Sequence, residues 1–220
     1  EANSFHRRVD AYQRLVNEPP RHLGDIAVIP FLAELLSDAG NFKEALLLRQ
    51  RLVGFWSTQD PTTFAGEMNN FGLSLYDLGR LDDALTIHRE QEVICRHILE
   101  EQKEATMVKR TRSILAASLG NQARILLVKG NKERATSLFK EQEEICRQLG
   151  DRKGLHSALG NLGVILADEG DLDGGIRLLR EKEQICRDLG DKQGLIDSLN
   201  GQAMILRDLD EALELYKEAE

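Results

Sequence analysis

Apolar residues in the C-terminal half of the chain recur with the spacing of one face of an α-helix. The offsets are i, i+4 and i+7, and the same set returns every 40 residues. The sets are Leu119, Ala123 and Leu126, then Leu159, Gly163 and Leu166, and then Leu199, Ala203 and Leu206. This pattern predicts amphipathic helices arranged in a repeated unit.

Several further features keep the same register along the chain. A glycine stands between two amphipathic segments of each unit, where it favours the left-handed conformation that ends a helix. The glycines are Gly40, Gly79, Gly130 and Gly170, and the matching phrases contain Asn70, Asn121 and Asn161 and then Cys95, Cys146 and Cys186. We therefore expect each unit to consist of a helix, a tight turn and a second helix.

Small residues recur where the two helices of a unit would cross. Gly163 in a first helix corresponds to Gly175 in the second, and Ala123 corresponds to Ala135 in the same way. Because a small side chain facing another small side chain lets two helices approach closely, we expect these pairs to lie in contact.

The spacing divides the chain into repeats with one interruption. We expect an N-terminal helix, an insert that lengthens the neighbouring helices, and a short last repeat that lacks its glycine turn. The predicted segments are 1–20 (helix, either a cap or the remnant of a preceding repeat), 25–60, 61–98, 99–112 (insert), 113–150, 151–190 and 191–220 (partial repeat). Because the first residue is Glu1 and the last repeat is short, we interpret the chain as a piece of a longer protein.

Composition and charge narrow the functional classes. Hydrophobic residues make up 41% of the chain and charged residues 30%, which is enough apolar surface for a buried core. The net charge of -8 argues against nucleic-acid binding, and no apolar run approaches the ~20 residues that span a bilayer. An odd number of widely spaced cysteines favours a reducing compartment, so we expect a cytoplasmic protein.

The sequence shows no motif that would support catalysis or cofactor binding. P-loop, HExxH and GxSxG patterns are absent, and we expect neither an enzyme nor a cofactor. His88, Glu92 and Cys95 are spaced so that one helix could present them together, but the scattered histidines and the lack of a CxxC pair argue against a metal site. The repeated cysteines are best explained as core residues.

The repeated unit resembles the tetratricopeptide repeat. The resemblance rests on Asn161-Leu162-Gly163, Gly170-Asp171-Leu172-Asp173 and Leu179, and it covers about residues 26 to 220. The period near 40 is similar to the extended repeats of kinesin light chains, Pins-type adaptors and bacterial signalling arrays. The family's second alanine is replaced here, by Gln91, Gln142 and Lys182. The resemblance implies an all-α, right-handed superhelical solenoid of helical hairpins.

Such a solenoid has a concave groove lined by the first helix of each unit. At 100° per residue, the side opposite the hairpin contact presents a recurring set of polar and apolar residues. The candidate peptide-binding residues are Asn69, Asn70, Leu73, Asp77, Asn121, Arg124, Asn161, Val164, Asp168, Asn200 and Met204. Glycines at 120 and 160 would let a ligand backbone come close.

An asparagine amide both donates and accepts hydrogen bonds, so the row of asparagines could pair with the backbone of an extended peptide. The resemblance supports this interpretation, since the equivalent asparagines of related arrays contact extended ligands. The alternative is that the asparagines fix the geometry between repeats. Arg124 could bind a ligand carboxylate or pair within the chain. Asp77 and Asp168 could attract a basic ligand or serve only as polar residues at the helix end. Leu73, Val164 and Met204 could form apolar pockets for a ligand or belong to the core between repeats.

The sequence therefore predicts a scaffold that binds an extended segment of another protein, or an intramolecular segment, and neither nucleic acid nor membrane. A second hypothesis is a sensor array within a larger signalling protein, where the repeats restrain or trigger an ATPase or protease effector. A third is self-assembly through end-to-end packing of repeats.

Overall fold

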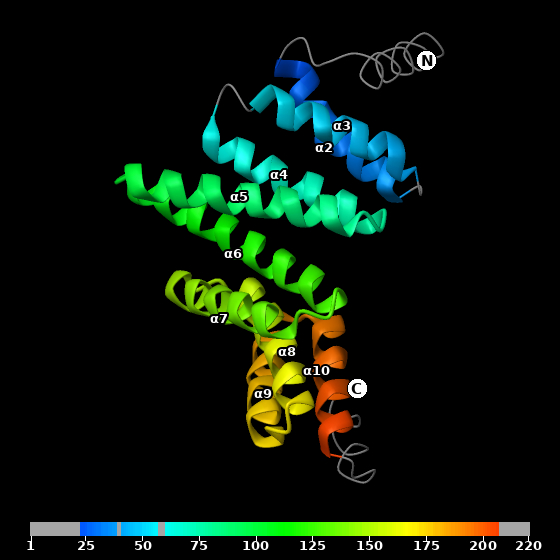
Figure 1. Cartoon of the computed structure of the whole chain (residues 1–220), viewed down its shortest axis with the longest axis vertical. Helices are drawn as coiled ribbons and strands as arrows, with labels where there is room; N and C mark the ends of the chain where they lie inside the picture. The colour runs from blue at the N-terminus through cyan, green and yellow to red at the C-terminus, as the bar shows by residue number, and fades with distance from the viewer. Residues whose placement is uncertain (1–22, 39–40, 57–59, 207–220) are drawn as a thin grey trace. The chain divides into compact units, whose positions relative to one another are not determined.

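The computed structural model describes residues 23–38, 41–56 and 60–206, and within these residues every regular element is a helix (Figure 1). The helices are α2 (Leu23–Asp38), α3 (Phe42–Trp56), α4 (Pro61–Asp77), α5 (Leu81–Glu101), α6 (Ala105–Val128), α7 (Lys132–Leu149), α8 (Arg152–Asp168), α9 (Leu172–Leu189) and α10 (Lys192–Leu206). The predicted N-terminal helix 1–20, the turn at Gly40 and the end of the partial repeat after residue 206 lie outside the described residues. None of the described helices is long and apolar enough to cross a membrane.

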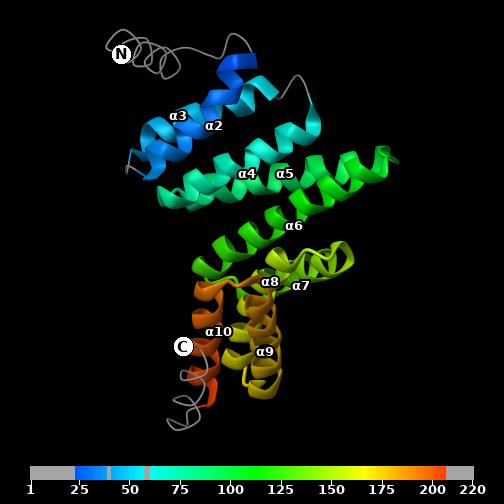
Figure 2. The ribbon, with the colours of Figure 1, turned by 180° about the vertical axis from the view of Figure 1, so that it is seen from behind.

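The chain forms two compact units, each larger than a single repeat, and the boundary between them lies between Ile114 and Leu115, within α6. From here on, the first unit and the second unit mean these two parts of the chain. In the first unit, α2 pairs with α3 and α4 pairs with α5, and α3 also packs against α4. In the second unit, α8 packs against both α7 and α9, and α10 packs against α9, as both ribbon views show (Figures 1 and 2). Each unit is thus built from helices that are neighbours in the sequence.

The described turns form at the glycines predicted to end the first helices. Gly79, Gly130 and Gly170 adopt φ angles of 73°, 78° and 93°, in the left-handed region that favours glycine. At the junction between repeats, Gly150 is left-handed (φ 66°) and the Asp151 side chain accepts a hydrogen bond from the Gly154 amide. The sequence Gly-Asp therefore ends one helix and caps the next.

Paired helices approach closely at small residues. A Cβ atom at Gly175 would lie 2.8 Å from the carbonyl oxygen of Gly163, so the two backbones are in direct contact. Ala123 and Ala135 are both fully buried. The candidate binding residues on α4, α6, α8 and α10 are at least partly exposed.

The helices on either side of the insert are the longest of those described. α5 has 21 residues and α6 has 24, whereas the other described helices have 15 to 18. The insert 99–112 includes the end of α5, a link at 102–104 and the first turns of α6. The extra sequence is therefore mostly helical.

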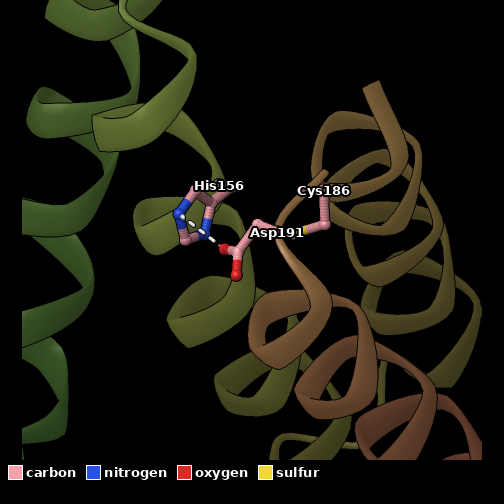
Figure 3. Close-up of side chains that lie close together, drawn as sticks. All are labelled: His156, Cys186 and Asp191. Carbon is pink, nitrogen blue, oxygen red and sulfur yellow. Dashed lines mark ion pairs between the residues drawn. The ribbon is translucent and has the colours of Figure 1, made fainter. Parts of the chain in front are cut away.

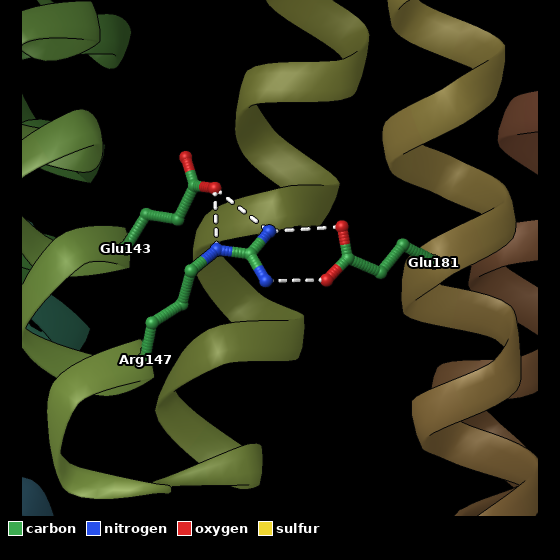
Figure 4. A network of polar contacts seen from close by, with 3 residues as sticks. All are labelled: Glu143, Arg147 and Glu181. Carbon is green, nitrogen blue, oxygen red and sulfur yellow. Dashed lines mark hydrogen bonds and ion pairs between the residues drawn. The ribbon is translucent and has the colours of Figure 1, made fainter.

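An ion-pair network joins the second helices of adjacent repeats in the second unit. The Arg147 guanidinium of α7 makes two hydrogen bonds to Glu181 of α9, of 2.6 and 2.9 Å, and a third to Glu143 one turn earlier on α7 (Figure 4). The hydrogen bonds from Arg147 hold the pKa of Glu181 below its usual value. This contact links α7 and α9 at the protein surface.

We expect Glu181→Gln to lower the free energy of unfolding by about 0.2–1 kcal/mol at neutral pH, because the pair is partly exposed and screened by solvent. Since the folded pKa lies below the ordinary 4.5, the carboxylate's stabilisation is complete above pH 4.5 and is lost as the pH falls through the lowered value. Urea unfolding from pH 7 to pH 3 should show the two proteins converge. A difference that persists unchanged at pH 3 would contradict this assignment.

Candidate functional site

The predicted binding face consists of the candidate residues on the first helices of the repeats. Each of these residues is at least partly exposed, so none is part of the closed core. In the first unit they are Asn69, Asn70, Leu73 and Asp77, all on α4. In the second unit they are Asn121 and Arg124 on α6, Asn161, Val164 and Asp168 on α8, and Asn200 and Met204 on α10.

The second unit brings three of these residues together around a pocket of about 190 Å³. Val164, Asp168 and Met204 line it, and Leu172 at the start of α9 contributes a further apolar wall. The lining is completed by Ala167, Gly201 and Ile205. Asn121, Arg124, Asn161 and Asn200 do not line the pocket.

Three of the residues that line the pocket are large, exposed apolar side chains. The fractional exposures are 49% for Val164, 45% for Leu172 and 81% for Met204. Large apolar side chains exposed together in a hollow are typical of an interaction site, whereas isolated ones need no explanation. Leu172 was not among the predicted residues, because its position at the start of a second helix gave no sign that it would face the next repeat.

One acidic residue lies at the edge of the pocket. The Asp168 carboxylate, which is 59% exposed, pairs with the Lys132 ammonium of α7 at 3.2 Å. The neighbouring repeat thus partly neutralises its charge, and the pair places one donor and one acceptor beside an apolar hollow.

The asparagines of the predicted binding face make contacts within the chain. The Asn161 amide donates a hydrogen bond to the Ser157 carbonyl oxygen one turn earlier on the same helix, at 2.9 Å. In the first unit, the Asn70 amide lies 3.5 Å from the Glu67 carboxylate, and burial raises the pKa of Glu67. Both of these contacts, of Asn70 and of Asn161, lie within one helix.

The expectation that Gly120 and Gly160 leave room for a ligand backbone is wrong. A Cβ atom at Gly120 would lie 2.5 Å from the Gln142 side-chain amide, and one at Gly160 would lie 3.1 Å from the Lys182 side chain. The second helix of the same hairpin therefore fills the space beside each glycine. Gln142 and Lys182, which replace the family's second alanine, occupy that space.

The helical cluster of His88, Glu92 and Cys95 does not form a joint site. His88 is fully buried against Gly72, with its Nδ1 atom 3.0 Å from the Gln91 side-chain oxygen. The Glu92 carboxylate pairs with Arg96 at 2.8 Å. Burial raises the pKa of the Cys95 and Cys146 thiols to about 12, which fits residues that pack in the core.

A family model for the tetratricopeptide repeat matches residues 68–90, which include most of α4 and the first half of α5. No curated protein sequence matches the chain.

Solved structures match over almost the whole chain. BtubC (BKLC) from P. vanneervenii has a TM-score of 0.74 at 21% identity, covering 99% of this chain and 87% of that chain. The nearly identical TPR-like repeats of a kinesin light chain-type protein of Podosopora anserina give 0.66 at 14%, covering 91% and 95%.

A third similar structure is a Signal Transduction ATPase with Numerous Domains (STAND) protein of Pyrococcus horikoshii with a tetratricopeptide repeat sensor. Its TM-score is 0.70 at 18% identity, covering 94% of this chain but only 30% of that chain. At these identities the likeness shows the fold alone.

The predicted all-α fold of tetratricopeptide-like hairpins is confirmed by these matches. Repeats of this kind generally serve as scaffolds for protein–protein interaction and are generally not catalytic. Residues 68–90 thus match a tetratricopeptide repeat, and the fold of the chain is that of tetratricopeptide-like repeat structures.

Proposed function

We propose that the second unit binds an extended segment of a partner protein along its predicted binding face and takes one apolar side chain of that segment into the pocket. The observation that supports this most is the pocket itself, because Val164, Asp168 and Met204 were selected from sequence position and line one hollow. Its volume of about 190 Å³ suits a single side chain better than a small-molecule ligand.

The polar residues of the same face supply the second part of the proposal. Asn161 lies one turn before Val164 on α8 and Asn200 one turn before Met204 on α10. A side-chain amide can donate to and accept from a peptide backbone, and each such bond contributes about 0.5–1.5 kcal/mol. The side-chain amides of this face would thus form hydrogen bonds with the backbone of the ligand, and the pocket would bind one of its side chains.

A sensor role within a larger signalling protein is the second candidate. It is favoured by the likeness to the STAND protein, whose tetratricopeptide repeats are described as a sensor and of which this chain spans 30%. The two candidates use the same face and differ in whether its occupant is another protein or a segment of a longer chain. Light scattering at several concentrations would reveal self-assembly, the third hypothesis.

The proposal is tested by selecting a displayed library of random linear peptides on the wild-type chain and measuring affinities of the selected peptides by calorimetry. We expect them to share an apolar residue, and Met204→Glu to weaken binding at least tenfold because a carboxylate would enter an apolar pocket. Met204 is 81% exposed, so folding should be unaffected.

The matched control is Ile196→Glu, which changes another exposed apolar residue of the same helix outside the pocket. This variant should bind the peptides as tightly as wild type. Equal binding by wild type and Met204→Glu, or equal loss in both variants, would show that the pocket is not the site. Circular dichroism of each variant excludes unfolding as the cause.

A further inference from the structure

Three side chains with metal-binding donor atoms meet at the junction of α8, α9 and α10, and they come from separate parts of the sequence. His156 lies on α8, Cys186 near the end of α9, and Asp191 immediately before α10 (Figure 3). One donor atom from each of the three lies within 4.8 Å of the other two. The His156 Nε2 atom is 3.7 Å from the Asp191 Oδ2 atom.

The local fold fixes the positions of the cysteine and the aspartate. The Asp191 carboxylate caps α10 by accepting a hydrogen bond from the Gly194 amide through Oδ1, at 3.0 Å, and this leaves Oδ2 facing His156. Cys186 is fully buried, and a Cβ atom at Gly194 would lie 2.7 Å from its sulfur. Glycine at this position therefore lets the sulfur come close to the capping carboxylate.

The preceding repeat contains the same cysteine, aspartate and glycine but no histidine. Cys146, Asp151 and Gly154 stand 40 residues before their counterparts, and the Cys146 sulfur lies 4.0 Å from Asp151 Oδ2. The residue 40 positions before His156 is Ala116, which is buried in one core cluster with Cys146. Cysteine and aspartate therefore have a structural role in both repeats, whereas the histidine is particular to the second of them.

The ring nitrogens of the His156 side chain do not both have hydrogen-bond partners. Its Nδ1 atom is buried and has no hydrogen-bond partner, while Nε2 faces the carboxylate at a distance longer than a hydrogen bond. The Nε2 atom faces Asp191 and is therefore the nitrogen available to a metal ion, and a bond there would leave Nδ1 without a partner.

We propose that His156, Cys186 and Asp191 bind a divalent transition-metal ion, with Zn²⁺ the best match to a ligand set of nitrogen, sulfur and oxygen. Bond lengths of about 2.0–2.3 Å in a tetrahedral site place donor atoms roughly 3.4–3.6 Å apart. Since the donor atoms lie within 4.8 Å of one another, they need to close by at most about 1.2–1.4 Å, within the reach of side-chain rotation. Three protein ligands leave a fourth position for water or for a donor from a partner.

Metal binding places different requirements on the protonation of His156 and of Cys186. Metal binding requires a neutral imidazole at His156, whose ring nitrogen supplies a lone pair, and a thiolate at Cys186. Formation of the metal–sulfur bond therefore breaks the S–H bond, and the proton leaves to solvent.

The metal would join the beginning of α8, the end of α9 and the beginning of α10. The pocket of the predicted binding face is lined by residues of the last turns of α8 and α10, so the two sites use opposite ends of these helices. The metal site is thus independent of the proposed peptide site and would stabilise the repeat junction that supports it.

The test is titration of the 220-residue chain with Co²⁺, monitored by absorbance, followed by displacement with Zn²⁺. We expect one ion per chain and a thiolate-to-cobalt charge-transfer band. Cys186→Ala should abolish that band and weaken Zn²⁺ binding at least tenfold. The matched control, Cys146→Ala, removes the equivalent buried cysteine of the previous repeat and should leave both measurements unchanged.

His156→Gln provides a second variant in case Cys186→Ala fails to fold, since it changes a partly exposed side chain and removes a ligand. It should also weaken Zn²⁺ binding at least tenfold. The proposal is overturned if the wild-type chain gives no charge-transfer band, or if His156→Gln binds Zn²⁺ as tightly as wild type. It is also overturned if Cys146→Ala loses binding to the same extent as Cys186→Ala.

Discussion

The close approach of two helices at paired small residues is the constraint on which the second unit depends. At Gly163 and Gly175 the backbones of α8 and α9 are in contact, and any side chain there would force the helices apart. This contact sets the crossing point of the hairpin, and the crossing point determines which residues of α8 are covered. Val164 and Asp168 remain exposed because they lie on the other side of the same helix.

Turns and surface contacts connect each hairpin of the second unit to the next. Each Gly-Asp junction ends one helix and caps the next, so consecutive hairpins begin with the same geometry. Arg147 and Glu181 then link the second helices of two repeats. Because the repeats share this geometry, equivalent residues of successive first helices lie near each other. Val164 and Met204, which are 40 positions apart in the sequence, line one pocket.

Periodicity was sufficient to predict the helical pairs, the turn glycines and the exposed face, because each of these depends on residues close in sequence or repeated at a fixed step. It was insufficient at Gly120, where the space beside a glycine is filled by Gln142 from the partner helix. The replacement of the family's alanine by Gln142 and Lys182 was visible in the sequence. Only the structure shows that these side chains contact Gly120 and Gly160. The grouping of His156 with Cys186 and Asp191 likewise depends on packing between three helices and leaves no short motif.

The most direct measurement is the free energy of unfolding of Gly175→Ala compared with that of Gly54→Ala. Alanine normally stabilises a helix interior by about 1 kcal/mol relative to glycine, and a Cβ atom at Gly54 would meet nothing within 4 Å. We therefore expect Gly54→Ala to stabilise the chain, and Gly175→Ala to destabilise it by about 1–3 kcal/mol, because its Cβ atom would overlap the Gly163 carbonyl oxygen. Stabilisation of similar size by both substitutions would contradict the close helix contact at the centre of this account.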